Sequence, residues 1–214
     1  MEFLEHVGPL KINWTCQLRV DFVEPKLLKV LKATGCRAVS YGIESGSQRI
    51  LDSDNKKIRI DQVRSAFKLH RRLGLAAVAL VIVGHPHERP EDLQATYDLL
   101  REIKPVYSSV QLMVPYPGTR LYDEVAEATG TITSSHWLDY VAAREPIFIP
   151  RDLNREIMLE YFQKIIDLNL GYRALWIRFT NFMRMLPRNI LDLKRITSDF
   201  REMIRPYGEE HGGE

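Results

Sequence analysis

Polar side chains that can do chemistry stand near the ends of β-branched segments in this chain of 214 residues. Glu44 ends one such segment, where its carboxylate could serve as a general acid or base or simply cap the next turn. Arg19 and Asp21 stand two residues apart on one predicted strand face, so they could bind a ligand or pair with each other. Spacing slightly favours the ion pair and leaves the role of Glu44 open.

Histidines and cysteines offer a weaker case for metal chemistry. The segment GHPHE, residues 84–88, contains two histidines that resemble half of a metal site, but no third ligand stands at metal spacing. We therefore expect structural or solvent-facing histidines there. Cys16 and Cys36 are the two cysteines of the chain and form no Cys-x2-Cys pair, which predicts small buried side chains.

Alternating elements must position these side chains. Helical periodicity separates the β-rich segments, with helices predicted after Pro25, over 61–72 with Asp61 as the cap, and over 90–103. This alternation predicts an α/β fold with a parallel sheet or barrel, which binds ligands beyond the carboxyl ends of its strands. The chain is too short for a closed eight-stranded barrel of about 250 residues. Strands are predicted at 10–23, 36–44, 75–84 and 108–114, the third of them buried on both faces.

The second part of the sequence differs in character. Residues 1–130 carry the alternation, whereas 131–214 are predicted to form a mostly helical extension, with helices over 152–183 and 188–205. Thirty basic and 28 acidic residues nearly cancel, so nucleic acid is an unexpected partner. The sequence shows no signal peptide and no apolar run of 18 residues, so we expect a cytoplasmic protein without a membrane span.

Three segments together are similar to the radical S-adenosylmethionine (radical SAM) superfamily. They begin RVDFVEPKLL (19–57), VIVGHPHERP (81–100) and MVPYPGTRLY (113–124). The resemblance is greatest to the branch that often carries an N-terminal cobalamin-binding domain. It implies a partial (βα) barrel of six strands, of which this chain supplies the last four.

The resemblance also implies a site for S-adenosylmethionine (SAM). Arg19 matches a polar contact near the methionine part, and Glu44, with Ser45 beside it, matches a contact to the ribose or amino group. Lys56 matches a basic residue that pairs with the SAM carboxylate through a charge-assisted hydrogen bond. Strand-end residues are expected to flank the adenine: Val83, Gly84, Val114 and Pro115.

Two features depart from the superfamily pattern. After the third predicted strand, the usual Gly-x-Pro-Gly-Glu-Thr reads GHPHER, so His87 replaces a glycine and Arg89 replaces a good helix cap. The superfamily also implies a [4Fe–4S] cluster on a Cys-x3-Cys-x2-Cys triplet, which this chain lacks. The implied cofactors are thus SAM, a cluster whose ligands lie outside this chain, and cobalamin where the N-terminal domain of that branch is present.

Three interpretations follow. The chain is the C-terminal part of a radical SAM enzyme acting on a small-molecule substrate, by methyl transfer, cyclisation or a related radical reaction. Alternatively, it is a non-catalytic binding or scaffold module that pairs with a cluster-bearing subunit. A third interpretation is an unrelated α/β enzyme that uses Glu44 as acid or base. The first is preferred because it accounts for all the motifs, and it predicts that the missing barrel strands leave a sheet edge unpaired.

Overall fold

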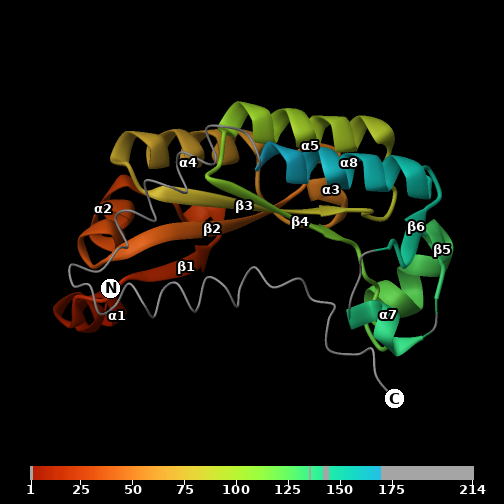
Figure 1. The fold of residues 1–214 in the computed structure, drawn as a ribbon, viewed down its shortest axis with the longest axis horizontal. Helices are drawn as coiled ribbons and strands as arrows, with labels where there is room; N and C mark the ends of the chain where they lie inside the picture. Colours follow the sequence, from red (N-terminus) through yellow and green to blue (C-terminus); the bar gives the residue numbers. More distant parts are fainter. Residues whose placement is uncertain (1, 135, 142–144, 170–214) are drawn as a thin grey trace, which may run out of the picture. The chain divides into compact units, whose positions relative to one another are not determined.

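A computed structural model describes residues 2–134, 136–141 and 145–169 (Figure 1). A parallel sheet of four strands forms its centre, in the order β1-β2-β3-β4. Sequential strands are therefore neighbours, each joined to the next by a helical crossover, which confirms the predicted α/β class. The strands are β1 (Trp14–Leu18), β2 (Cys36–Glu44), β3 (Ala76–Val83) and β4 (Tyr107–Leu112).

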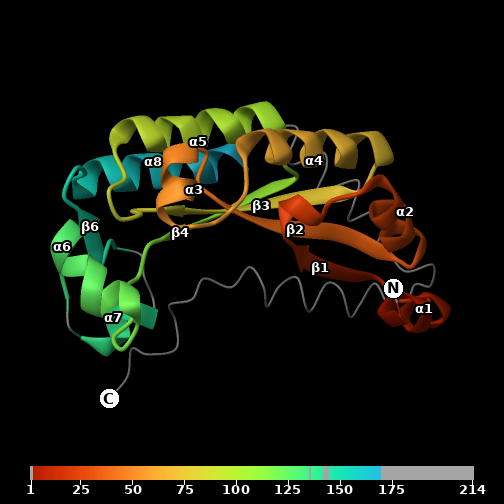
Figure 2. The same ribbon diagram turned by 180° about the vertical axis from the view of Figure 1, so that it is seen from behind.

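Four helices pack on the same side of this sheet, as both views show (Figures 1 and 2). Their apolar faces join the strands in one core, because each helix repeats apolar residues at helical spacing. Leu93 and Met158, from two of these helices, are fully buried. Burial of a side chain of this size stabilises the fold by about 1.5–3 kcal/mol. The helices are α2 (Pro25–Ala33), α4 (Ile60–Leu73), α5 (Pro90–Ile103) and α8 (Arg155–Leu168).

Burial alternates along β3 and distinguishes the two faces of the sheet. Val81 and Val83 are buried toward the helices, whereas Leu80 and Ile82 on the other face are half-buried. The prediction that this strand is buried equally on both faces was therefore wrong. In the described ranges no helix packs on the second face, which leaves it available to a ligand or to further chain.

The two edges of the sheet differ. At the β4 edge, the Asn169 side chain accepts a hydrogen bond from the Ser108 backbone N–H (2.7 Å) and donates one to its carbonyl (2.8 Å). This amide thus takes the place of a fifth strand at one position. At the other edge, β1 pairs with β2 alone among the described residues. The exposed side chains of Thr15 and Gln17 lie along that strand.

Several predicted boundaries were wrong in detail. The first strand ends at Leu18, and Val20–Phe22 form a 3-10 turn, η2, so Arg19 and Asp21 lie beyond the strand. Helix α4 begins at Ile60, and its terminal Arg59 N–H is bonded to the Gln62 side chain (2.7 Å), not to Asp61. The helix predicted over 152–183 is described as α8 up to Leu168. Its remainder and the helix predicted over 188–205 lie outside the described residues, and the domain boundary near 130 stays a prediction.

Shorter elements complete the described part. None of its helices is long and apolar enough to cross a membrane. A small antiparallel pair, β5 with β6, follows the main sheet. The remaining elements are α1 (Glu2–Val7), η1 (Gly8–Leu10), α3 (Gln48–Ser53), η3 (Leu121–Ala126), α6 (Glu127–Thr129), β5 (Gly130–Ile132), α7 (Trp137–Val141) and β6 (Phe148–Pro150).

Candidate functional site

An ion pair occupies the carboxyl end of β2. The Lys56 Nζ atom lies 2.6 Å from Oε1 of Glu44, with the two side chains 25% and 23% exposed. Gly42 lies beneath this pair, and a Cβ atom there would come within 2.5 Å of the same oxygen and 3.3 Å of the ammonium. Glycine therefore leaves the space that the pair needs. Glu44 and Lys56, predicted as SAM contacts, are brought together.

The loop that carries Lys56 has an unusual backbone. Asn55 and Lys57, on either side of Lys56, both adopt positive φ angles, 53° and 56°. Non-glycine residues visit this region only when the surrounding structure holds them there. Part of that hold is the hydrogen bond from the Lys56 N–H to the Leu51 carbonyl (2.9 Å). The loop thus presents the lysine side chain to the strand end.

Arg19 joins the same cluster through the Lys56 backbone. Its guanidinium binds the Asp21 carboxylate in a two-bonded fork, with distances of 3.1 and 3.0 Å, and also donates to the Lys56 carbonyl (3.3 Å). The fork raises the pKa of Arg19 and lowers that of Asp21. The ion pair anticipated between Arg19 and Asp21 is therefore present, and it lies beside the Glu44–Lys56 pair.

The turn after β3 is closed by a buried carboxylate. Glu88, fully buried, accepts hydrogen bonds from the backbone N–H groups of Gly84 (2.6 Å) and His85 (3.2 Å). Burial raises the pKa of Glu88 to about 7, while the nearby His85 and the two N–H groups oppose that rise. His87 takes a φ of +61°, so it adopts the conformation that the usual glycine would provide. The tight turn is thus kept in spite of the substitution.

His85 connects this turn to the lysine loop. Its Nδ1 atom lies 2.5 Å from Oδ2 of Asp54, an ion pair whose angle is not that of a hydrogen bond, and its Nε2 atom lies 3.4 Å from the Glu44 carbonyl. Burial disfavours the charged ring, but Asp54 and Glu88 outweigh it and raise the pKa of His85. The sequence missed this cluster, because no spacing rule links Asp54 to His85.

A carboxylate caps the start of α5, where Arg89 stands in place of a good N-cap residue. The Asp92 side chain accepts from the Arg89 backbone N–H (2.9 Å) and from the Ser47 hydroxyl (2.6 Å), and it also contacts Arg49. Burial raises the pKa of Asp92, but these partners outweigh it, and the net shift is downward. A carboxylate three residues into the helix thus replaces the missing cap.

Ser45 lies between β2 and this helix. Its side chain is fully buried, and its Oγ lies 3.3 Å from the hydroxyl of Thr96 in α5 and accepts from the Ser47 N–H (3.1 Å). The placement indicates a packing role for the serine hydroxyl, next to Glu44 in sequence but on the helix side.

The residues expected to flank adenine end two neighbouring strands. The Val83 side chain is buried in the helical core and does not face the strand-end surface. Its backbone carbonyl accepts a hydrogen bond from the Met113 N–H (2.8 Å). Gly84 has a φ of +97°, and a Cβ there would lie 2.6 Å from Cε of Met158. Val114 is half-buried and Pro115 buried after β4. Ile82, on the open face, is a further apolar candidate; all eight residues of β3 are apolar, so the sequence alone could not assign it to that face.

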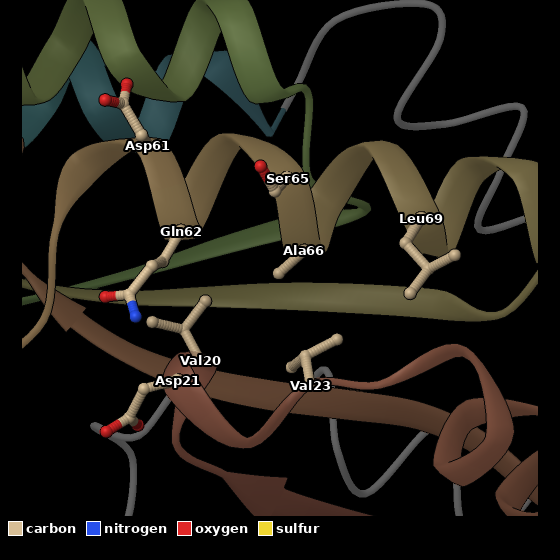
Figure 3. Close-up of a pocket in the computed structure, with 8 residues that line it drawn as sticks. All are labelled: Val20, Asp21, Val23, Asp61, Gln62, Ser65, Ala66 and Leu69. Carbon is tan, nitrogen blue, oxygen red and sulfur yellow. The ribbon is translucent and has the colours of Figure 1, made fainter.

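A separate cavity of about 380 Å³ lies between η2 and α4, on the helix side of the sheet (Figure 3). Figure 3 shows Val20, Val23 and Ala66 within it and the Asp21 carboxylate at one end. Neither Glu44 nor Lys56 lines it, so it is distinct from the strand-end cluster. Its lining residues are Val20, Asp21, Val23, Asp61, Gln62, Ser65, Ala66 and Leu69.

The thiols of this chain do not fit an iron–sulfur cluster. Cys16 and Cys36 lie on the neighbouring strands β1 and β2 and are both free. The Cys36 thiol donates a hydrogen bond to the Ala38 carbonyl (3.4 Å). The neighbouring thiols influence each other, so that the pKa of Cys16 is lowered and that of Cys36, which is almost fully buried, is raised. Among the described residues, no three Cys, His, Asp or Glu side chains are grouped to hold a metal ion. A cluster with three thiolate ligands would need cysteines from elsewhere.

Comparison with known proteins assigns a part of the chain to a superfamily. Residues 6–100 match the radical SAM superfamily, and these include Arg19, Glu44, Lys56 and the turn after β3. The matched part of the chain belongs to that superfamily. The radical SAM region ends within α5, so β4 and the later elements lie beyond it.

Two curated relatives extend this finding. The chain is 37% identical over 131 residues to an uncharacterised methyltransferase of Pyrococcus horikoshii, covering 61% of this chain and 28% of that protein. It is 29% identical over 154 residues to the anaerobic magnesium-protoporphyrin IX monomethyl ester cyclase of Cereibacter sphaeroides, covering 71% and 24%. The chain therefore spans about a quarter of the length of these relatives.

A solved structure shows the same fold. The radical SAM methyltransferase TsrM from Kitasatospora setae, determined with cobalamin and a [4Fe–4S] cluster bound, has a TM-score of 0.53 and 18% identity over 63% of this chain and 27% of that one. The four parallel strands with helices on one face thus correspond to part of the radical SAM barrel. The expected fold class is confirmed.

Proposed function

We propose that this chain provides the SAM-binding end of a radical SAM enzyme that acts on a small molecule. The observation that carries the proposal is the Glu44–Lys56 ion pair at the carboxyl end of β2, inside the part that matches the superfamily. Parallel α/β folds bind ligands at this end of their strands. Each member of the pair is partly exposed, so a ligand can reach it.

The methionine part of SAM carries both an ammonium and a carboxylate group, and this zwitterion suits a site that already holds opposite charges. Lys56 would pair with the ligand carboxylate and Glu44 with the ammonium or the ribose hydroxyls, so each protein charge exchanges one partner for another. Charge-assisted hydrogen bonds of this kind are among the stronger polar contacts. Arg19, already bonded to the Lys56 carbonyl, would hold the lysine loop beside the methionine part.

The strand ends of β3 and β4 suit the adenine. Gly84, which lacks a side chain, and the backbone of Val83 end β3 without a bulky group, while Val114 and Pro115 add apolar surface after β4. Ile82 extends this apolar surface on the open face of the sheet. These residues would bind the base by its flat face and its edge.

The [4Fe–4S] cluster would come from outside this chain, because its two cysteines do not fit the three-thiolate requirement. Such a cluster, held by cysteines from outside this chain, would supply the electron for the reductive cleavage of SAM. The outer edge of β1, unpaired within the described ranges, suits the addition of the strands that carry the cluster. These strands would belong to the same polypeptide or to a separate subunit, together with a cobalamin domain if the protein follows that branch.

The reaction class is proposed from the relatives, whose names report methyl transfer and ring cyclisation. Either would take place on the open face, next to the SAM site. A reducing, cytoplasmic location is proposed with it, because both thiols are free and a [4Fe–4S] cluster needs reduced cysteines.

Calorimetric titration of the chain with SAM tests the binding proposal. We expect Lys56→Ala and Glu44→Ala to weaken binding about ten-fold or more, the loss of one charge-assisted contact. Lys57→Ala is the control, since it removes an exposed lysine of the same loop one position away from Lys56. Unchanged affinity in both site variants would remove the site assignment.

A second experiment separates the enzyme from a scaffold module, the alternative function, which is favoured by the lack of cluster ligands. The chain is combined anaerobically with the cluster-bearing segment, found by translating the DNA upstream of Met1 or among co-purified subunits, and release of 5′-deoxyadenosine is measured. Release that requires Lys56 supports the enzyme. SAM binding without release from the complete assembly supports the scaffold.

A further inference from the structure

The cluster formed by Asp54, His85 and Glu88 has no role in the site as proposed so far. His85 is 1% exposed and Glu88 fully buried, and Oε1 of Glu88 has no hydrogen-bond partner. Burying an ionisable side chain costs free energy unless it is fully paired or hydrogen-bonded. The two buried members of this cluster, His85 and Glu88, therefore need an explanation.

The imidazole ring of His85 faces an oxygen on each side. Nδ1 lies 2.5 Å from the Asp54 carboxylate and Nε2 lies 3.4 Å from the Glu44 carbonyl. The Nδ1 contact is an ion pair by distance, since its angle is not that of a hydrogen bond. A ring that donates from Nε2 to the Glu44 carbonyl and is also protonated at Nδ1 places its positive charge beside the Asp54 carboxylate, whereas a neutral ring leaves an Nδ1 lone pair close to that negative charge. The close approach of the ring to the carboxylate therefore favours the charged form.

Charged groups around the ring agree with this assignment. Negative charge comes from Asp54 in the loop after α3 and, as its carboxyl ionises around pH 7, from Glu88 in the turn before α5, and both favour a positive ring. The other charged groups nearby are the Glu44–Lys56 pair at the end of β2 and the Asp92–Arg49 pair at the start of α5.

The two atoms that His85 contacts belong to the two sides of the proposed SAM site. Asp54 lies two residues before Lys56 in the loop with two positive φ angles, and the Glu44 carbonyl belongs to the residue that pairs with Lys56. A link between Asp54 and Glu44 thus fixes the lysine loop relative to the strand end. Without it, both the loop and Glu44, itself at a φ of +69°, lose a restraint on unfavourable backbone.

We propose that His85 is held as an imidazolium and is a positioning residue of the SAM site, because it ties Asp54 to the Glu44 carbonyl and so keeps Lys56 opposite the Glu44 carboxylate. This inference rests on the function proposed above. It adds that SAM affinity depends on pH through a buried group that does not touch the ligand. Affinity is full while the ring is charged and falls as pH rises through the His85 titration.

Two measurements on the full 214-residue chain test this. The ring nitrogens of His85 are followed by ¹⁵N NMR against pH, with His85→Asn identifying the signal, and SAM affinity is measured by calorimetry over the same pH range. We expect both ring nitrogens to stay protonated above the pH of about 6.5 at which a free histidine loses its charge. We also expect the NMR midpoint and the affinity midpoint to coincide.

Variants separate positioning from general stability. His85→Asn and Asp54→Asn are each expected to weaken SAM binding about ten-fold at neutral pH, the loss of one charge-assisted link. Asp54 is partly exposed in a loop, so its variant should fold even if the buried histidine variant does not. His87→Asn is the matched control, since it changes an exposed histidine two residues away at a positive φ that asparagine tolerates.

Glu88→Gln adds a readout that a merely structural histidine would not give. The amide keeps an acceptor for the two backbone N–H groups but removes the negative charge near the ring. Both midpoints should therefore move together to lower pH. A neutral His85 ring at pH 6, or wild-type affinity and pH dependence in both His85→Asn and Asp54→Asn, would overturn this inference alone. If the wild-type chain binds no SAM at all, the proposed function fails, and the positioning role fails with it.

Discussion

Gly84 and Met158 touch across the core boundary: a Cβ atom built on Gly84 would lie 2.6 Å from Cε of Met158 in α8. The glycine ends β3 with a φ of +97°, and the methionine is fully buried on the helix side. This contact sets how closely α8 approaches the strand end that is proposed to receive adenine. Gly84 is thus constrained twice, by its positive φ and by the lack of space for a Cβ atom, and suitable variants can measure the two effects separately.

Gly84→Ala should destabilise the chain by about 1–3 kcal/mol, because it adds the displacement of Cε of Met158, the flexible end of a fully buried side chain, to the cost of a positive φ. Gly118→Ala is the matched control, since Gly118 has a φ of +80° and no atom within 4 Å of an added Cβ. Gly118→Ala should cost only about 1 kcal/mol, which is the cost of placing alanine at a positive φ without any steric clash. Urea denaturation measures both. Equal losses in the two variants would show that the contact with Met158 carries no energy.

Asn169→Ala should cost about 1–3 kcal/mol, because it leaves the buried N–H and carbonyl of Ser108 without their partners. Gln163→Ala removes an exposed amide from the same C-terminal part of the chain, where Gln163 bonds only to Asp167 in the hydrogen bonds described, and should change the free energy of unfolding by less than about 0.5 kcal/mol. The comparison uses the same denaturant titration. A loss for Asn169→Ala no larger than for the control would contradict the strand-like role of this amide.

Glu88 should make stability depend on pH in a defined direction. Its pKa is raised to about 7 in the fold, so the native state holds this proton between the ordinary pKa of about 4.3 and pH 7, whereas the unfolded chain releases it. The contribution of Glu88 to stability is therefore greatest at low pH and falls as pH rises through that window, by about 3–4 kcal/mol in total and about 2–3 kcal/mol between pH 5 and pH 8. In Glu88→Gln this fall should be absent. The check is the difference between the unfolding free energies of wild type and variant from pH 5 to pH 8, and a difference that does not change with pH would refute it.

The two thiols should react at different rates. Cys16 is half-buried and its pKa is lowered by the neighbouring Cys36 thiol, whereas Cys36 is 1% exposed and its pKa is raised. Since the thiolate is the reactive form, an alkylating reagent should modify Cys16 first. Cys36→Ala should slow the modification of Cys16, because the neighbouring thiol that lowers its pKa is lost. Mass spectrometry of the alkylated protein follows both sites, and faster labelling of Cys36 would reverse the assignment.

Much of the fold followed from sequence because local signals agree with it. Alternating β-rich and helical segments predicted four parallel strands, and Gly74 and Pro90 mark helix ends where the structure has them. The boundary at Leu18 was missed, since the VDF segment has strand-like residues but turns within three positions. The cap of α5 was missed for a similar reason, because Asp92 acts from inside the helix, where a side chain is usually assigned to its surface.

The sequence by itself determined that the chain holds only two cysteines and that Glu44, Lys56 and Gly84 stand at element ends, because composition and local spacing are properties of the chain alone. Only the tertiary structure decided that Lys56 meets Glu44, that Ser45 turns to the helix side, and that Ile82 rather than Val83 faces the open surface. The contacts of His85 with Asp54 and with the Glu44 carbonyl were likewise decided there. The physical reason is that parallel strands joined by helical crossovers bring residues from distant segments to one edge. Which side chains meet at that edge depends on strand register and loop conformation, and neither is encoded in any short stretch of sequence.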